Sequence, residues 1–311
     1  MPPTFLCLGG QRCGTTWLYE ALKRCPHVHV SADKETDYFN RKIFTEDLAS
    51  YERHFEVPEG RTVAVRGEVS PNYCMLKRPA IELIRRLYPH LRLVLILRNP
   101  VERSISQAWL DLCHMRGRPE RGVAAWEYLL HAERQRTRRR SDYVRVLTDW
   151  LGVFGPEALH VGIYDDLVAD PARFFRNILR HIGAPDWPLP DELAHQRVFG
   201  SRQPPPSAFV RWYYARQYRE PVARLNELLG GRVADWLRDI DAALAGGRAW
   251  WPWLRAVNRY VLSAPEKVAY AAYDAWRDSR FQERAQTILR QHEERRSAPA
   301  PPKRRTALIV G

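Results

Sequence analysis

The sequence lacks long hydrophobic runs and has few cysteines. No stretch of its 311 residues forms an uncharged, apolar window of about 18 residues, the length needed to cross a membrane. The chain begins with Met1-Pro2-Pro3 and lacks the basic and apolar segments of a secretory signal. The five cysteines are odd in number, widely spaced and never in a Cys-x-x-Cys pair, which indicates free thiols rather than a disulfide framework or a zinc site. These absences predict an unprocessed, cytoplasmic protein.

Acidic residues are also in short supply. Lys and Arg number 49 against 36 Asp and Glu, which leaves a net charge of +13. Such an excess favours anionic partners, among them nucleotides, nucleic acid, acidic glycans and lipid head groups. The arginines of residues 134–140 are interpreted as a solvated face. No RNA-recognition or helix-turn-helix signature accompanies the arginines, so nucleic acid is not an expected partner and a non-enzymatic nucleic-acid-binding protein is the weaker alternative.

A glycine-rich turn lies between an early apolar run and an amphipathic segment, which predicts a strand, a loop and a helix. The spacing Gly9-x4-Gly14-Thr15-Thr16 nearly fits the phosphate-loop pattern G-x4-G-K-[ST]. The lysine of that pattern reaches the β- and γ-phosphates of a nucleoside triphosphate, but Thr15 stands in its place and the nearest cation is Arg12. The loop therefore predicts an anion site that departs from the triphosphate type.

Apolar runs alternate with helical patterns along the chain, which favours a parallel sheet covered on both faces. We predict an α/β fold of three layers, a P-loop-like parallel sheet flanked by helices, with a helical C-terminal extension. The expected strands are residues 4–10, 27–31, 63–71, 91–97 and 159–166. The expected helices are residues 14–24, 45–55, 79–87, 99–112, 123–135, 141–154, 170–182, 209–229 and 233–244.

Three parts of the chain follow from this pattern: a main domain over residues 1–240, a helical, aromatic-rich extension over 241–296 and a basic, disordered tail over 297–311. The proline-rich stretch 184–207 is interpreted as a lid over the ligand. The tryptophans and aliphatic residues of 248–262 either pack on the domain, which is the default, or contact another subunit or a membrane surface.

Polar side chains follow several expected strands, at the sheet edge where open parallel sheets bind ligands. Lys34 and Glu35 come after the second strand, Glu68 ends the third, and Arg98 ends the aliphatic fourth. Ser106 lies on the helix after Arg98, which begins strongly with an asparagine cap and a proline. Glu35 is the preferred general base and Glu68 the reserve.

Three segments together make the sequence similar to the sulfotransferase family, most closely its carbohydrate-modifying and bacterial branches. They are residues 9–16 (GGQRCGTT), 34–39 (KETDYF) and 97–106 (LRNPVERSIS). The resemblance extends over about residues 4–240. It includes Tyr164-Asp165-Asp166-Leu167, where the family often carries a similar acidic pair without using it to hold a metal.

This resemblance implies a donor, 3′-phosphoadenosine 5′-phosphosulfate (PAPS), and no metal. It implies that Arg12, Thr15 and Thr16 bind the 5′ group, and that Arg98 and Ser106 bind the 3′-phosphate. Trp17 would stack on the adenine, and Arg202 is a candidate from a late loop. The full set implied for the donor is Gln11, Arg12, Cys13, Gly14, Thr15, Thr16, Trp17, Arg98, Ser106 and Arg202.

The family glutamate matches Glu35, which would take the proton of the acceptor, while Arg12 and Lys34 neutralise charge. Tyr38 and Phe39 are expected to desolvate Glu35. The acceptor is expected to be a carbohydrate or a glycosylated natural product. A P-loop kinase or NTPase that uses Mg-ATP stays open as the alternative, because Asp165 ends a strand as a magnesium-holding aspartate would.

Overall fold

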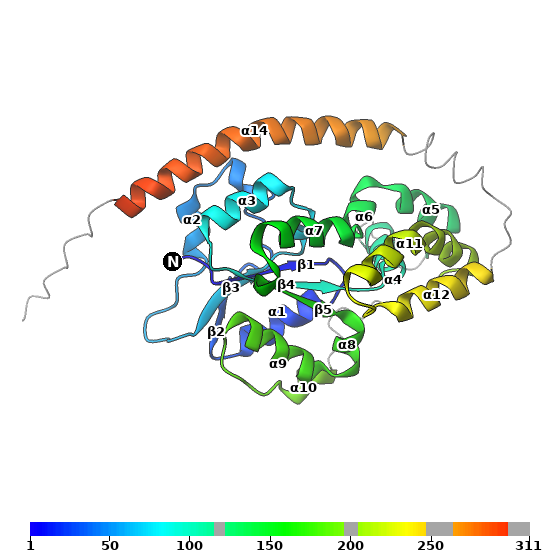
Figure 1. The fold of residues 1–311 in the computed structure, drawn as a ribbon, viewed down its shortest axis with the longest axis horizontal. Coiled ribbons are helices and arrows are strands. Elements are labelled where there is room, and N and C mark those ends of the chain that lie inside the picture. Colours follow the sequence, from blue (N-terminus) through cyan, green and yellow to red (C-terminus); the bar gives the residue numbers. More distant parts are fainter. Residues whose placement is uncertain (115–121, 196–204, 247–263, 298–311) are drawn as a thin grey trace, which may run out of the picture.

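The computed structural model describes residues 1–114, 122–195, 205–246 and 264–297. Five parallel strands form one sheet in the order β2-β3-β1-β4-β5 (Figure 1). Their bounds are β1 Phe5–Gly9, β2 Val28–Val30, β3 Val65–Val69, β4 Arg92–Leu97 and β5 Leu159–Ile163. The predicted α/β fold with a parallel sheet is confirmed.

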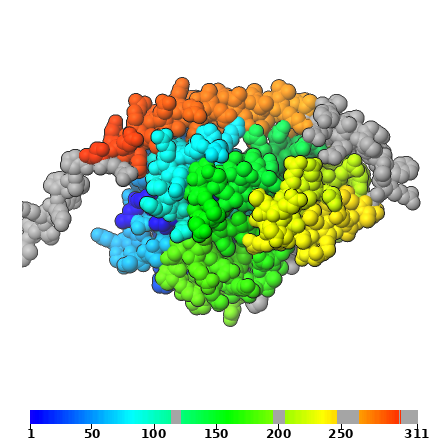
Figure 2. Space-filling view, viewed as in Figure 1, coloured from blue at the N-terminus to red at the C-terminus, as the bar shows by residue number. Residues whose placement is uncertain are grey.

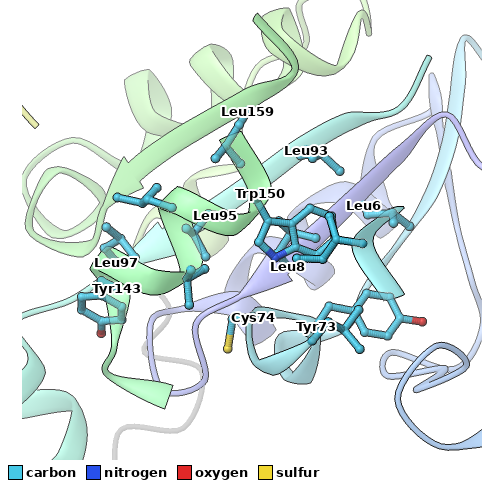
Figure 3. Packing of buried hydrophobic residues seen from close by; sticks show 14 of the residues in the cluster. Leu6, Leu8, Tyr73, Cys74, Leu93, Leu95, Leu97, Tyr143, Trp150 and Leu159 are labelled. Carbon is cyan, nitrogen blue, oxygen red and sulfur yellow. The ribbon is translucent and has the colours of Figure 1, made fainter. Parts of the chain in front are cut away.

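The two central strands are apolar on both faces because helices cover both. On β1, Leu6 and Leu8 point into one core while Phe5 and Cys7 point into the other. Figure 3 shows the first core, in which Trp150 of a covering helix lies against these leucines.

The helices lie in two layers (Figure 1). Helices α3 (Arg78–Leu87) and α7 (Tyr143–Phe154) cover the face of Leu6 and Leu8. The opposite face is covered by α1 (Thr15–Arg24) and α9 (Pro171–Ile182). The remaining helices are α2 Leu48–Arg53, α4 Pro100–Trp109, α5 Ala125–Glu133, α6 Gln135–Arg140, α8 Tyr164–Ala169, α10 Asp191–His195, α11 Ala208–Leu228, α12 Ala234–Ala245 and α14 Ala264–Ser297. Shorter turns are η1 Lys42–Phe44, η2 Pro71–Met75, η3 Leu110–His114 and η4 Pro156–Ala158.

Two segments differ from the sequence-based expectation. The fifth strand ends at Ile163, and the acidic pair that follows it begins helix α8 instead of extending the strand. Within the stretch interpreted as a lid, α10 forms and Leu193 is completely buried. Residues 196–204 of that stretch, with Arg202, lie outside the described residues.

Helix α14 lies across one side of the molecule, next to α3 and η1 (Figure 2). Its Ile288 is fully buried, and its Asp274 carboxylate lies 3.4 Å from the Lys77 ammonium. Arg284 donates hydrogen bonds to the carbonyl oxygens of Ile43 at 2.6 Å and Glu46 at 2.5 Å. The apolar segment 248–262 and the tail beyond Ser297 lie outside the described residues. No helix in the described ranges is both long and apolar enough to cross a membrane.

Candidate functional site

The loop between β1 and α1 has a backbone that only glycine accommodates at two points. Gly9 has φ of 118°, and a Cβ there would lie 2.6 Å from the carbonyl oxygen of Pro71. Gly14 has φ of 86°, and a Cβ there would lie 2.7 Å from a methyl group of Leu167. Helix α1 begins directly afterwards, with no acidic residue in its first turn. Its free N–H groups and its dipole favour an anion in the loop.

Two arginines and a serine meet at the carboxyl ends of β1 and β4. The Nε of Arg12 donates to the Oγ of Ser106 at 3.0 Å. An Nη1–H of Arg98 donates to the carbonyl oxygen of Arg12 at 3.1 Å. The structure thus brings together Arg12, Arg98 and Ser106, which the sequence places far apart.

These guanidinium groups have no acidic partner within ion-pair distance in the part of the chain that the structure describes. Burial lowers the pKa of Arg12, and the nearby charge of Arg98 lowers it further. Like charges held close together in a partly buried place are stabilised by a bound anion. The structure thus holds two guanidinium groups close together at two strand ends, with the charge that a candidate anion site requires.

Neighbouring side chains hold Arg98 in place. Its guanidinium lies over the ring of Tyr164, 4.6 Å from the ring centroid, and its carbonyl oxygen accepts a hydrogen bond from Tyr143 at 2.9 Å. The sequence analysis did not identify either tyrosine. A signal existed for Tyr164 alone, since it directly follows a strand as Arg98 does.

Cys13 of the loop and Trp17 of α1 belong to the core and not to an open surface. Cys13 is fully buried, and burial raises the pKa of its thiol to about 11, so it fills the loop as a neutral side chain. Trp17 is 7% exposed, packs edge-on against Phe174 and Phe175, and donates from Nε1 to the carbonyl oxygen of Leu193 at 2.7 Å. This is the packing of a core residue, and the structure gives no support to adenine stacking on Trp17.

Glu35 lines a cavity of about 620 Å³ that also includes Gln11 of the glycine-rich loop. Its carboxylate lies 2.9 Å from the ammonium of Lys34, and 35% of the Glu35 side chain is exposed. A carboxylate in an open cavity beside an anion loop can reach the proton of a bound molecule. Tyr38 and Phe39, expected to desolvate Glu35, are buried in the core against Tyr51.

Glu68, the reserve base, is fully buried among hydroxyl groups. Tyr51 donates to its carboxylate at 2.6 Å, Ser70 at 2.6 Å and Tyr73 at 2.9 Å, and Thr36 donates as well. Burial raises the pKa of Glu68, against the lowering effect of these hydrogen bonds. These contacts make Glu68 part of the core network, and of the two candidate bases only Glu35 lines the cavity.

The arginines of residues 134–140 do not form a solvated face, and that interpretation is wrong. Arg140 is only 6% exposed, and Arg134, Arg136 and Arg140 line the same cavity as Glu35. Helix α6 packs against η2, α14 and α5, which buries Arg140, whereas Arg136 stays exposed.

Facing these arginines is a hydrogen-bonded pair that the sequence analysis did not identify. The imidazole of His131 lies 2.9 Å from the carboxylate of Asp111, and Gln107 donates to the same carboxylate at 2.7 Å. Burial lowers the pKa of His131, so the ring is neutral and donates from Nε2. Burial would raise the pKa of Asp111, but its two hydrogen-bond donors hold it below the usual range. Only the spacing of Gln107 and Asp111, one helical turn apart, could have revealed part of this cluster.

Asp165 does not face the anion loop as a magnesium-holding aspartate would. Its carboxylate accepts a hydrogen bond from Nε1 of Trp236 at 2.6 Å, and Asp166 lies 3.6 Å from Arg232. Within the described ranges, no three His, Cys, Asp or Glu side chains gather as metal ligands would. The comparison with a magnesium-binding strand is therefore wrong, because the two carboxylates bind Trp236 of α12 and Arg232 of the turn before it.

Comparisons with known proteins agree with this geometry. Residues 41–188 match a family profile described as “Sulfotransferase family”. Among curated proteins, a membrane-associated sulfotransferase, kil1, of Dictyostelium discoideum is 30% identical over 133 residues, covering 42% of this chain and 28% of that protein. The human bifunctional heparan sulfate N-deacetylase/N-sulfotransferase 3 is 24% identical over 276 residues, covering 76% of this chain and 31% of that protein. The chain thus spans less than a third of the length of these relatives.

A solved structure shares the fold. The sulfotransferase from Alicyclobacillus acidocaldarius superposes with a TM-score of 0.62 at 22% sequence identity, covering 76% of this chain and 99% of that one. The similarity extends to the arrangement of the central sheet and its helices.

Proposed function

Because this chain belongs to the sulfotransferase family, we propose that it transfers a sulfuryl group from PAPS to a hydroxyl or amine of an acceptor. The observation that carries the proposal is that Arg12 and Arg98 lie close together at two adjacent strand ends. Neither guanidinium has a carboxylate partner among the described residues. PAPS has two separate phosphate positions and no triphosphate. It therefore needs fixed cations at two places and no lysine at the position of Thr15.

The proposed donor contacts follow from these positions. Arg12, Thr15 and the first N–H groups of α1 would hold the 5′-phosphosulfate, because they surround the glycine-rich loop. Arg98 and Ser106 would hold the 3′-phosphate. The hydrogen bond between Arg12 and Ser106 links the two groups of residues.

In the proposed reaction the acceptor oxygen or nitrogen attacks the sulfur in line with the bridging oxygen. The bond from sulfur to that oxygen breaks, and adenosine 3′,5′-bisphosphate leaves with the bonding electrons. Arg12 and the helix N–H groups stabilise the charge that builds on the bridging oxygen. Glu35 takes the proton of the acceptor, and Lys34 keeps Glu35 oriented through their ion pair.

The acceptor proposed is a carbohydrate or a glycosylated natural product. The cavity of Glu35 has room for a sugar-sized group, and its polar lining suits a molecule with many hydroxyl groups. One of the relatives acts on heparan sulfate, as its name states, which is consistent with a glycan acceptor. A cytoplasmic location stays a prediction from the sequence.

A thermal-shift experiment tests the donor without knowledge of the acceptor. Adenosine 3′,5′-bisphosphate, present at about 100 times its Kd, is expected to raise the Tm by about 5 °C. The double variant Arg12→Ala/Arg98→Ala, if folded, should lose this shift. Stabilisation by Mg-ATP with none by adenosine 3′,5′-bisphosphate would instead favour the kinase alternative.

A further inference from the structure

The cavity beside Glu35 is part of a longer groove. A second cavity of about 480 Å³ shares four lining residues with it, Asp37, Arg41, Asn72 and Arg136. The second cavity reaches Tyr270 and Tyr273 of α14. The groove therefore runs from the glycine-rich loop to the C-terminal helix, which lies outside the region matched by the family profile.

Arg140 is the buried cation of this groove. Its Nη2 donates to the side-chain oxygen of Asn72 at 3.2 Å, and its Nε is buried without a hydrogen-bond partner. No carboxylate of the described residues lies within 4.0 Å of Arg140 or of the exposed Arg136 beside it. Burial, together with the nearby charge of Arg136, lowers the pKa of Arg140 to about 10. A buried guanidinium in this state is stabilised by an anion that reaches it from the groove.

The acidic side chains that line the groove do not pair with Arg140. Glu35 pairs with Lys34, Asp111 accepts from His131 and Gln107, and Asp37 accepts from Asn72 at 3.2 Å. The carboxyl of Glu266 has a raised pKa because of burial, despite the nearby charges of Arg134 and Arg136. None of these four carboxyl groups forms an ion pair with Arg140.

Two acceptor atoms in the same cavity also lack partners. The side-chain oxygens of Gln11 and Gln107 are buried and make no hydrogen bond to the described residues. Buried oxygens without donors are costly, so a donor that reaches them, whether from water or from a bound molecule, stabilises them. The cavity thus offers two oxygens for donors and one guanidinium for an anion.

We infer that the acceptor carries an anionic group, a carboxylate or a sulfate, that binds Arg136 and Arg140, next to the hydroxyl or amine that faces Glu35. This inference rests on the proposed function, because it takes the cavity of Glu35 as the acceptor site. Arg136 and Arg140 select the acceptor and are not part of the chemical step. The groove beyond them leaves room for an acceptor that extends toward α14.

The test uses two matched pairs of probes, with the donor site saturated by adenosine 3′,5′-bisphosphate. One pair is a disaccharide of glucuronic acid and N-acetylglucosamine and its carboxyl-reduced form. The other is 4-hydroxybenzoate and its methyl ester. Calorimetry should show that the acid of at least one pair binds about tenfold or more tightly than its neutral counterpart. A preference in the first pair indicates that the acceptor is a sugar acid, and a preference in the second pair indicates a phenolic acid.

Substitution of Arg136 disturbs the fold least, because its side chain is exposed. Arg140→Lys keeps the buried positive charge and removes the planar guanidinium group that binds an anion through two N–H groups. Arg136→Ala should reduce the preference for the acid, and Arg238→Ala on α12, whose side chain is 72% exposed, should leave it unchanged. Equal binding of acid and neutral probes in both pairs, or a preference that survives Arg136→Ala, would overturn the inference. If adenosine 3′,5′-bisphosphate itself does not bind, the proposed function fails instead.

Discussion

Arg98 connects the end of β4 to the glycine-rich loop through a single hydrogen bond to the carbonyl oxygen of Arg12. Replacing it with alanine removes a guanidinium and, in the proposed function, its contact with the 3′-phosphate. Hydrogen bonds to charged groups contribute about 1.5 to 3 kcal/mol, so Arg98→Ala should weaken binding of adenosine 3′,5′-bisphosphate by about tenfold to a hundredfold in calorimetry. Arg238→Ala serves as the exposed control. Unchanged affinity in a folded Arg98→Ala protein would rule out this role.

Glu35, of the segment 34–39, and Glu68, of β3, should respond in different ways to the same substitution. Glu35→Gln removes the proposed base from an open cavity, so turnover should fall by about a hundredfold or more while the Tm is unchanged. Glu68→Gln places amide hydrogens against hydroxyl groups that now donate to a carboxylate, so it should lower the free energy of unfolding by about 1 to 3 kcal/mol. Turnover assays and denaturant unfolding of both variants provide the measurement. A Glu35→Gln enzyme with full turnover would remove Glu35 from the base role.

Sequence reasoning located Arg12, Arg98 and Glu35 because each lies just after an apolar strand, and parallel strands end at one edge. It preferred Glu35 to Glu68 but could not show that Glu68 is buried, since that burial depends on Tyr51 and other hydroxyl groups from separate segments. The same limit applies to Trp17. Its ring is covered by Leu193 and α9, which lie more than 150 residues away in the chain.

Helix α14 is the element whose contribution the sequence could not establish. Its Ile288 is fully buried, whereas its Val268 is 71% exposed. Ile288→Ala should weaken the packing of α14 on the domain by about 2 to 4 kcal/mol, because a buried branched side chain is lost and a cavity is left. Hydrogen exchange should then become faster in α14 and stay unchanged in β1 and β4.

Val268→Ala is the matched control for this substitution and should leave exchange in α14 unchanged. Equal protection of α14 in the Ile288→Ala and Val268→Ala proteins would show that the helix does not depend on this contact.

The strands and long helices were predictable because their patterns are strong. A nearly continuous aliphatic run such as β4 is buried on both faces, and the asparagine cap and proline before α4 start a helix locally. The short helices α8 and α10 were not predictable in the same way. α8 begins with Tyr164-Asp165-Asp166, whose carboxylates contact Trp236 of α12 and Arg232 of the turn before it. α10 contacts Trp17 through the carbonyl oxygen of Leu193.

For the whole molecule, the order β2-β3-β1-β4-β5 explains why distant segments meet. The central position of β1 places its loop between the ends of β3 and β4. The groove inferred for the acceptor lies where α6 and α14 meet the helical layer, with α6 arginines lining the cavity of Glu35 and α14 tyrosines lining the second cavity. Sheet order and helix docking depend on long-range packing, so the sequence predicted the glycine-rich loop between β1 and α1 but not the groove.

Global stability should fall in mild acid because of a histidine pair between the sheet and α9. The rings of His160 and His181 lie 5.5 Å apart, and burial, together with the neighbouring charge of His181, lowers the pKa of His160 to about 4. The unfolded chain, with an ordinary histidine pKa of about 6.5, binds more protons than the folded one between these values. His160 therefore contributes stability that is present above pH 6.5 and lost as the pH falls toward 4, at most about 3 kcal/mol.

Substituting His160 tests this effect, because glutamine is neutral throughout the range. Denaturant unfolding at pH 7 and at pH 4.5 should show a smaller loss of stability for His160→Gln than for the unsubstituted protein. His90→Gln changes an exposed histidine and should show the same loss as the unsubstituted protein. A loss that is equal in all three proteins would place the acid sensitivity outside the histidine pair, in the carboxylates that hold ion pairs at the surface.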